Sequence, residues 1–359
     1  MAIPRTSGDI TPGWLTNALR AGGRLPAGGV ESLSIERIGQ VRGFAGSISR
    51  LIIQYEDESD APSTMVVKLS SVDPDIRRYA SEDGMYRRET MYYRELAGES
   101  GIPVPDCYFA DLDPGSGDFV LLLEDLTGLQ EGDEIAGCSL QQAELVVRTL
   151  ARLHARWWND RRVAGLSWLT GPADHSKQFN RLENLYLDAW NRATDTLAAI
   201  YPPTTFAIAE RFGPGLAAVL HTSTVGDQTL NHGDCHLGNM FFRDDQVVFT
   251  DWQNIMVTGP GLDLAYFIQG SLPVETRRTH EQDLLALYNS TLAKNGVTNY
   301  PPEKLFEDYR RDLLRTLIPS VLSVANLDMN APESRELVET IGGRMIAIAD
   351  WNCGDLIPG

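Results

Sequence analysis

One polar segment and the hairpin predicted after it restrict the fold of this chain more than any other feature. Residues 231–239 have the sequence NHGDCHLGN, which carries a carboxylate at Asp234 and an amide at Asn239. Apolar residues 240–242, a polar turn and a second apolar run predict two short strands that reverse direction. This hairpin is expected to bring a further carboxylate, Asp251, back beside Asn239.

These three polar groups suit a particular chemistry. An amide oxygen and a carboxylate delivered by different segments, Asn239 and Asp251, are hard ligands of the kind that Mg²⁺ takes, with its other ligands coming from water and phosphate. Asp234 is then left to accept a proton. The pattern therefore predicts phosphoryl transfer with bound Mg²⁺. The alternative is that His232, Asp234 and His236 are turn and cap residues of an ordinary loop.

The order of these groups matches a known motif. In protein kinases the catalytic loop has the form H-R-D-x-x-x-x-N, with Asp as base and Asn on a metal, and D-F-G supplies the next metal ligand. His232, Asp234 and Asn239 occupy the corresponding three positions, and Asp251 begins an Asp-Trp-Gln sequence where D-F-G would stand. The segment thus has the spacing of a kinase catalytic loop, with different residues between the shared positions.

With His-Gly-Asp-x-His-x-Gly-Asn followed by Asp-Trp-Gln, the chain resembles the aminoglycoside phosphotransferase and choline-kinase-like superfamily, and within it most of all the ecdysteroid-kinase-like branch. These are small-molecule kinases with a protein-kinase-like fold. The resemblance implies an α+β, bilobal architecture: a small β-rich nucleotide-binding lobe with one helix over residues 1–125, and a larger α-rich catalytic and substrate-binding lobe over 126–359. A length of 359 residues also favours more than one core.

A glycine-containing turn near the N-terminus is the first nucleotide-binding candidate. It joins alternating segments 32–38 and 48–55, which are typical of strands. Gly43 and Gly46 are in register with the G-x-G-x-x-G loop that covers ATP phosphates in kinases, while Val41 stands at the first glycine position. The match is partial, and an ordinary hairpin turn has the same composition.

Lys68 interrupts the apolar strand predicted over 64–70. A buried ammonium requires a partner, because desolvating an unpaired charge is costly. Glu89, on an amphipathic helix predicted over 85–96, is the expected partner, with Glu82 and Glu95 as competitors. In the kinase fold such a pair holds the Lys on the α/β-phosphates. The alternative is a Lys whose stem packs while its head group reaches water.

The apolar run 119–123 predicts a buried strand that ends at Glu124. By the family resemblance this is the hinge between lobes, where the carbonyl of Glu124 and the amide of Leu126 meet the adenine. A plain exit from the strand is the alternative.

The remaining patterns are mainly helical. Ser139 and Gln142 form a capping box before an apolar stripe, and His154 beside this stripe is expected to be a core histidine bonded to a neighbour. Helical patterns follow over 179–197, 208–220, 281–294, 303–325 and 334–350. Asp263 either caps the helix that it begins or, as in the family, accepts hydrogen bonds that brace the catalytic loop.

Composition excludes several classes of partner. A net charge of −18 argues against nucleic acid, which needs clustered Lys and Arg. No apolar run approaches the roughly 20 residues of a membrane span, and the first residues lack a signal-peptide pattern, so a cytoplasmic location is expected.

The four cysteines are scattered, without a C-x-x-C pair, and Cys235 is expected to be a small loop residue rather than a reactive thiol.

The sequence therefore predicts ATP-dependent transfer of the γ-phosphoryl group to a hydroxyl of a small molecule. Asp234 would act as base, Asn239 and Asp251 would hold Mg²⁺, and Lys68 held by Glu89 would bind the nucleotide. The alternative is a nucleotide-binding pseudokinase that serves as a scaffold. A protein kinase is disfavoured because no A-P-E segment follows Asp251 and residues 254–263 are too few for an activation loop.

Overall fold

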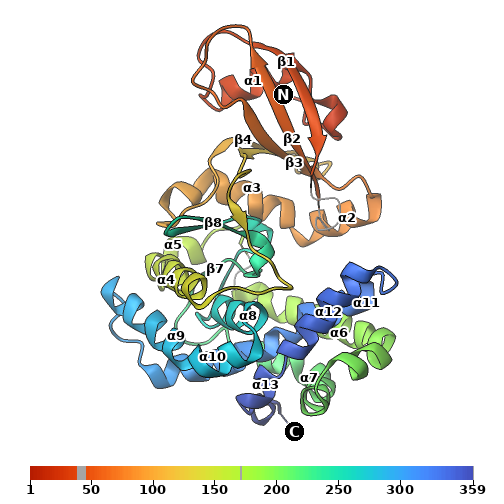
Figure 1. Cartoon of the computed structure of the whole chain (residues 1–359), viewed down its shortest axis with the longest axis vertical. Helices are drawn as coiled ribbons and strands as arrows, with labels where there is room; N and C mark the ends of the chain where they lie inside the picture. Colours follow the sequence, from red (N-terminus) through yellow and green to blue (C-terminus); the bar gives the residue numbers. More distant parts are fainter. Residues whose placement is uncertain (39–45, 170–171, 359) are drawn as a thin grey trace. The chain divides into compact units, whose positions relative to one another are not determined.

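The computed structural model describes residues 1–38, 46–169 and 172–358 (Figure 1). Gly43 and the turn around it lie outside the described residues. The chain separates into two compact units, one made of residues 1–129 with 248–254 and the other of residues 130–247 with 255–359. The first contains the main sheet and the second is mostly helical, which confirms the predicted α+β class.

The first unit is built on a five-stranded antiparallel sheet with strand order β1-β2-β3-β5-β4. Its strands are β1 (Val30–Arg37), β2 (Gly46–Tyr55), β3 (Thr64–Ser70), β4 (Cys107–Leu112) and β5 (Phe119–Glu124). The helix α1 (Pro12–Ala21) begins where the Thr11 side chain accepts a hydrogen bond from the amide of Trp14, and it packs its apolar face on the sheet. The central position of β3 places its residues in the middle of this core.

Two helices follow β3 in the first unit. The helix α2 (Pro74–Asp83) was not predicted, and α3 (Met85–Glu95) covers the predicted helix 85–96. Gly84 separates them with φ 82°, a left-handed conformation that glycine adopts readily. Short 3₁₀ turns lie at Ser7–Asp9, Ala97–Glu99 and Trp252–Asn254.

The second unit consists mainly of helices. They are α4 (Leu140–Arg156), α5 (Arg161–Ala164), α6 (Pro172–Ile200), α7 (Pro203–Thr222), α8 (Leu262–Ser271), α9 (Val274–Lys294), α10 (Pro302–Arg315), α11 (Leu317–Asn326), α12 (Pro332–Arg344) and α13 (Ala347–Asp350). The predicted capping box before α4 is present. The pattern over 303–325 is divided at Thr316, because Pro319 has no N–H for the carbonyl of Arg315 and so favours a new helix start.

Short strands and turns surround the predicted catalytic loop. They are β6 (Gln130–Glu131), β7 (Thr229–Asn231), β8 (Met240–Arg243), β9 (Gln246–Phe249), β10 (Met256–Thr258) and the 3₁₀ turns Leu237–Asn239 and Cys353–Leu356. β7 pairs with β10, and β6, β8 and β9 form a three-stranded sheet. The two predicted strands of the hairpin therefore form. Within the described part of the chain, none of the helices combines the length and the apolar composition that a bilayer span needs.

Candidate active site

Lys68 lies in the middle of β3, opposite Ile48 on β2 and Leu121 on β5, and only 6% of its surface is exposed. Its Nζ donates to Glu89 Oε1 at 2.9 Å and to Asp251 Oδ1 at 2.8 Å. The predicted pairing of Lys68 with Glu89 is confirmed. The structure adds a second carboxylate to this pair, because the segment 248–254 belongs to the same compact unit.

The electrostatics of this cluster favour a charged lysine. Burial lowers the pKa of the Lys68 ammonium, but the carboxylates of Asp251 and Glu89 outweigh burial and hold its pKa above the ordinary value. Burial raises the pKa of Glu89 against the opposing effect of Lys68, and the charge of Asp251 raises it further. One cation thus lies between two carboxylates, and burial favours the protonated form of Glu89, the more buried of the two.

The Asp-Trp-Gln sequence is fixed to α3 through its tryptophan and its glutamine. The indole of Trp252 is fully buried and stacks on Tyr92, with ring centroids 4.0 Å apart and an interplanar angle of 14°. Arg88, one residue before Glu89, donates from Nε to the carbonyl of Gln253 at 2.8 Å. The sequence predicts the helix that carries Tyr92 and Arg88 but not the contacts of these two side chains with Trp252 and Gln253.

These attachments hold Asp251 in an uncommon backbone conformation. Its φ is 62°, in the left-handed region that costs a non-glycine residue about 1–2 kcal/mol. The contacts of Trp252 and Gln253 with α3 supply the constraint that keeps it there. The carboxylate of Asp251 is thereby directed at Lys68.

Gly46, the part of the predicted glycine turn that the structure describes, is the first residue of β2 and pairs with Ser70. A Cβ at this position would stand 2.7 Å from the carbonyl oxygen of Leu69 and 3.7 Å from the side chain of Lys68. The backbone of β2 therefore approaches β3 more closely than a residue larger than glycine at position 46 would allow. Glycine is required here for close packing.

The predicted hinge residues lie where β5 ends. Glu124 pairs with Met65 in the sheet, and its amide donates to the carbonyl of Asp106 at 2.8 Å. Leu126 accepts a hydrogen bond from the amide of Leu129 at 3.0 Å. Between them Asp125 forms an ion pair with Arg50 of β2 at 2.9 Å. The exit from β5 is thus tied back to the sheet and turns immediately.

In the second unit, Asp263 at the start of α8 organises the predicted catalytic loop. Its fully buried carboxylate accepts hydrogen bonds from the backbone amides of His232, at 2.7 Å, and Gly233, at 2.9 Å. No side-chain cap is formed at the start of α8. Of the two roles open for Asp263, the structure therefore supports bracing of the loop.

His154 of α4 completes this brace. Its Nε2 lies 3.2 Å from Asp263 Oδ2 and its Nδ1 2.7 Å from the hydroxyl of Tyr288, so the prediction of a core histidine is confirmed. Burial acts to raise the pKa of Asp263, but His154, His232 and the amide of Gly233 outweigh burial and lower it. The brace is therefore an ionised carboxylate.

Asp234 and Asn239 are joined within the loop itself. The Nδ2 of Asn239 donates to the backbone carbonyl of Asp234 at 2.9 Å, which directs Oδ1, the oxygen that a cation would need, away from that carbonyl. Between them Cys235 is fully buried, and burial raises the pKa of its thiol well above the ordinary value. Cys235 is therefore a neutral packing residue, as predicted.

The side chain of Asp234 has a hydroxyl neighbour that sequence reasoning missed. Tyr266, one turn after Asp263 on α8, donates a hydrogen bond to it. Burial raises the pKa of Tyr266 well above its usual value, and the charge of Asp234 raises it further, so the hydroxyl keeps its proton. The i, i+3 spacing of Asp263 and Tyr266 is a signal that could have suggested a shared face.

The predicted ligands of Mg²⁺ are Asn239 and Asp251. Asn239 and Asp251 offer an amide and a carboxylate oxygen, which are ligands of the right type. No group of three or more His, Cys, Asp or Glu side chains that could hold a metal occurs among the residues the structure describes. Mg²⁺ keeps several waters and takes phosphate oxygens, so it needs few protein ligands of this type.

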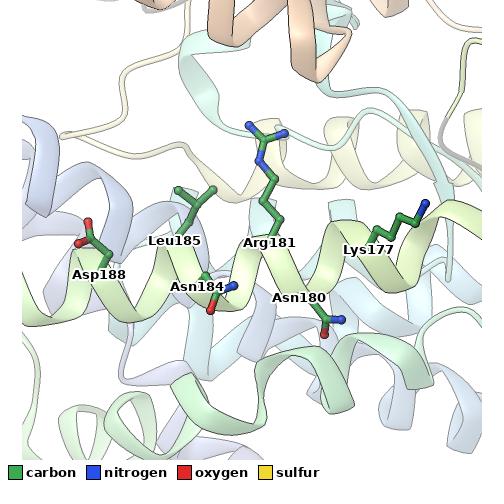
Figure 2. A pocket seen from close by; sticks show the side chains of 6 residues that line it. All are labelled: Lys177, Asn180, Arg181, Asn184, Leu185 and Asp188. Atoms are coloured by element: carbon green, nitrogen blue, oxygen red, sulfur yellow. The ribbon is translucent and has the colours of Figure 1, made fainter.

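A separate hollow of about 540 Å³ lies along α6 (Figure 2). It is lined by Lys177, Asn180, Arg181, Asn184, Leu185 and Asp188. Figure 2 shows Lys177 and Arg181 projecting from one side of the helix and the two asparagines from another. None of the predicted nucleotide or catalytic residues lines this hollow.

The sheet with its buried Lys–Glu pair and the helical unit with its braced loop define a protein-kinase-like fold. Residues 40–296 match the model of the ecdysteroid kinase-like family, so this chain belongs to that family. No curated protein is similar enough in sequence to match.

Solved structures share this fold at low sequence identity. A Ralstonia eutropha protein described as an aminoglycoside phosphotransferase is 16% identical, with TM-score 0.55, over 96% of this chain and 98% of its own. Choline kinase from Cryptosporidium parvum is 12% identical, with TM-score 0.58, over 89% of each chain. Amicoumacin kinase, solved with AMP-PNP and Ca²⁺, is 12% identical, with TM-score 0.50, over 90% of each chain.

Proposed function

We propose that this protein is an ATP-dependent small-molecule kinase that transfers the γ-phosphoryl group to a substrate hydroxyl. The observation that carries the proposal is the buried ammonium of Lys68 between Glu89 and Asp251. Buried ion pairs contribute little to stability compared with apolar side chains of similar size. The cluster is therefore better explained by function: it holds a cation in place to bind phosphate oxygens. Membership of a kinase-like family supports this explanation.

In this proposal the first unit binds the nucleotide. Lys68, oriented by Glu89, contacts the α- and β-phosphates, and the backbone around Gly43 and Gly46 covers them. The end of β5 receives the adenine through the carbonyl of Glu124 and the amide of Leu126. Gly46 supports this assignment because its lack of a side chain brings the β2 backbone close to Lys68.

The loop residues would carry out the transfer. Asp234 orients the acceptor hydroxyl and takes its proton as the hydroxyl oxygen bonds to the γ-phosphorus and the bond from phosphorus to the leaving ADP oxygen breaks. Asn239 and Asp251 would hold Mg²⁺, which supplies neutralisation of phosphate charge when bound. The brace from Asp263 keeps the loop in one conformation, so that most of the catalytic effect comes from positioning.

A panel of candidate alcohols tests the proposal. The purified chain is incubated with ATP and Mg²⁺ and with an aminoglycoside, choline, a sterol-like alcohol or a sugar, and ADP formation is measured for each. We expect one class to raise ADP formation above the rate with water alone, EDTA to abolish the increase, and Lys68→Ala to reduce it in a folded protein. Binding of ATP and Mg²⁺ without phosphorylation of any alcohol would favour the scaffold instead.

A further inference from the structure

The loop between β6 and α4 lies against the predicted catalytic loop in the second unit. The amide of Gly132 donates to the carbonyl of Met240 at 2.9 Å, and β6 pairs with β8. A Cβ on Gly132 would stand 2.4 Å from the carbonyl oxygen of Leu237, so this approach depends on glycine. Residues more than one hundred positions apart in the sequence are thus packed backbone to backbone.

This contact places Glu134 on the imidazole of His236. Glu134 Oε1 lies 3.2 Å from His236 Nδ1, and the two side chains are 16% and 28% exposed. Gly238 leaves the space that the pair occupies, because a Cβ there would stand 2.5 Å from Glu134 Oε1 and 3.1 Å from His236 Nδ1. The pair is therefore enclosed by the loop that carries Asp234.

The other nitrogen of His236 faces Asp234. Its Nε2 is 3.7 Å from Asp234 Oδ1, and the hydroxyl of Tyr266 donates to the same aspartate. The rings of His236 and Tyr266 lie 6.4 Å apart between centroids. Asp234 is thus flanked by two side chains, one anchored on α8 and the other anchored by Glu134.

A buried arginine fixes the position of Glu134. Arg344 of α12 donates to the backbone carbonyls of Glu134 at 2.7 Å, Ile135 at 2.8 Å and Gly270 at 2.6 Å. Gly270 belongs to α8, the helix that carries Tyr266. The Arg344 guanidinium therefore links the loop that carries Glu134 to α8, the helix that carries Tyr266.

We propose that Glu134 and His236 form a carboxylate–imidazole pair that positions Asp234 for phosphoryl transfer; this inference rests on the proposed function. The carboxylate of Glu134 beside Nδ1 favours a proton on that nitrogen and so fixes the orientation of the ring, and the ring in turn restricts rotation of the Asp234 side chain. His236 and Glu134 are positioning residues. A carboxylate misplaced by about 1 Å costs on the order of 100-fold in rate.

A double-mutant cycle tests this pair with the acceptor identified by the panel. Glu134→Gln and His236→Gln are each expected to lower kcat by about 10- to 100-fold with little change in KM for ATP. The double variant should be no slower than His236→Gln alone, because the carboxylate acts through the ring. Glu339→Gln and His280→Gln, on α12 and α9, are the matched controls and should have wild-type kcat. Wild-type kcat in either single variant, or simple addition of the two effects, would overturn the inference.

Failure of the pair can be separated from failure of the proposed function. If no alcohol is phosphorylated, the proposed function is wrong; if Asp234→Asn is inactive while Glu134→Gln has wild-type kcat, only the pair is wrong. If Glu134→Gln does not fold, Gly238→Ala displaces the Glu134 carboxylate without removing it and should lower kcat in the same way. Normal kcat in a folded Gly238→Ala protein would also count against the pair.

Nitrogen-15 NMR of the histidine side chains provides a measurement that needs no acceptor. The chain has six histidines, so the His236 signal can be assigned by its loss in His236→Gln. We expect a proton on Nδ1 in the wild type and a changed Nδ1 shift in Glu134→Gln. A His236 signal that is insensitive to Glu134→Gln would show that the two side chains are not paired.

Discussion

Lys68→Met removes the cation that lies between Glu89 and Asp251 and should destabilise the first unit substantially. The carboxylate of Glu89 is 1% exposed and that of Asp251 is 28% exposed, so most of the cost falls on Glu89. Removing one partner of a buried ion pair costs about 3–5 kcal/mol while the other stays ionised. The comparison is therefore made well above pH 7, because burial raises the pKa of Glu89 to about 7 even beside Lys68. Lys68→Met/Glu89→Gln removes the uncompensated charge as well and should recover most of this loss.

Hydrogen exchange, measured peptide by peptide, is the appropriate assay because a chain with two compact units need not unfold in one step. The free energy of opening for α3 and β3 should fall by about 3–5 kcal/mol in Lys68→Met and by much less in the double variant. Lys294→Met, at an exposed position of α9, is the control. Protection of α3 in Lys68→Met that equals the Lys294→Met control would refute the reasoning.

Three further predictions concern other parts of the site. Asp263→Asn replaces an acceptor of two backbone amides and should cost about 1–3 kcal/mol in urea unfolding of the second unit; an unchanged midpoint would contradict the brace. Gly46→Ala should lower Tm and weaken ATP affinity, because its Cβ would stand 2.7 Å from the Leu69 oxygen, whereas Gly13→Ala, with nothing within 4 Å, should do neither. Burial raises the pKa of Glu89 from 4.5 to about 7, so the nucleotide-free fold takes up a proton at this carboxylate. The contribution of Glu89 to stability should therefore be present at low pH. It should fall as pH rises through 7, by at most about 1.4 kcal/mol per pH unit. Glu89→Gln should remove that slope, and an identical pH profile in the variant would contradict it.

The local elements were predictable because their signals are local. The strand around Lys68, the helix bearing Glu89 and the capping box at Ser139 follow from periodicity and cap residues within one segment. The helix α2 was missed although Asp73 and Pro74 give a start signal and Gly84 an end, because its middle is charged and only Ala80 is buried. Start and end signals were more informative there than hydrophobic pattern.

The contacts that position the site were less predictable because they join distant segments. The pairing of Lys68 with Glu89 could be predicted from a burial argument and a family resemblance, but nothing in the sequence indicates that Asp251 also reaches Lys68. The contact of Arg344 with the carbonyl of Glu134 spans 210 positions and involves a backbone oxygen, which every residue has. Such contacts depend on tertiary packing, and residue type alone does not specify them.

The rate of Asp234→Asn is the measurement that tests the central claim most directly. Asparagine keeps the size of the side chain and its hydrogen-bonding reach but lacks the basic oxygen, so ATP and Mg²⁺ should bind with unchanged affinity. With the acceptor found in the panel, kcat should fall by about 10²–10⁴-fold, the contribution usual for general acid–base catalysis. Full activity of Asp234→Asn with that acceptor would contradict the assignment of Asp234 as the base.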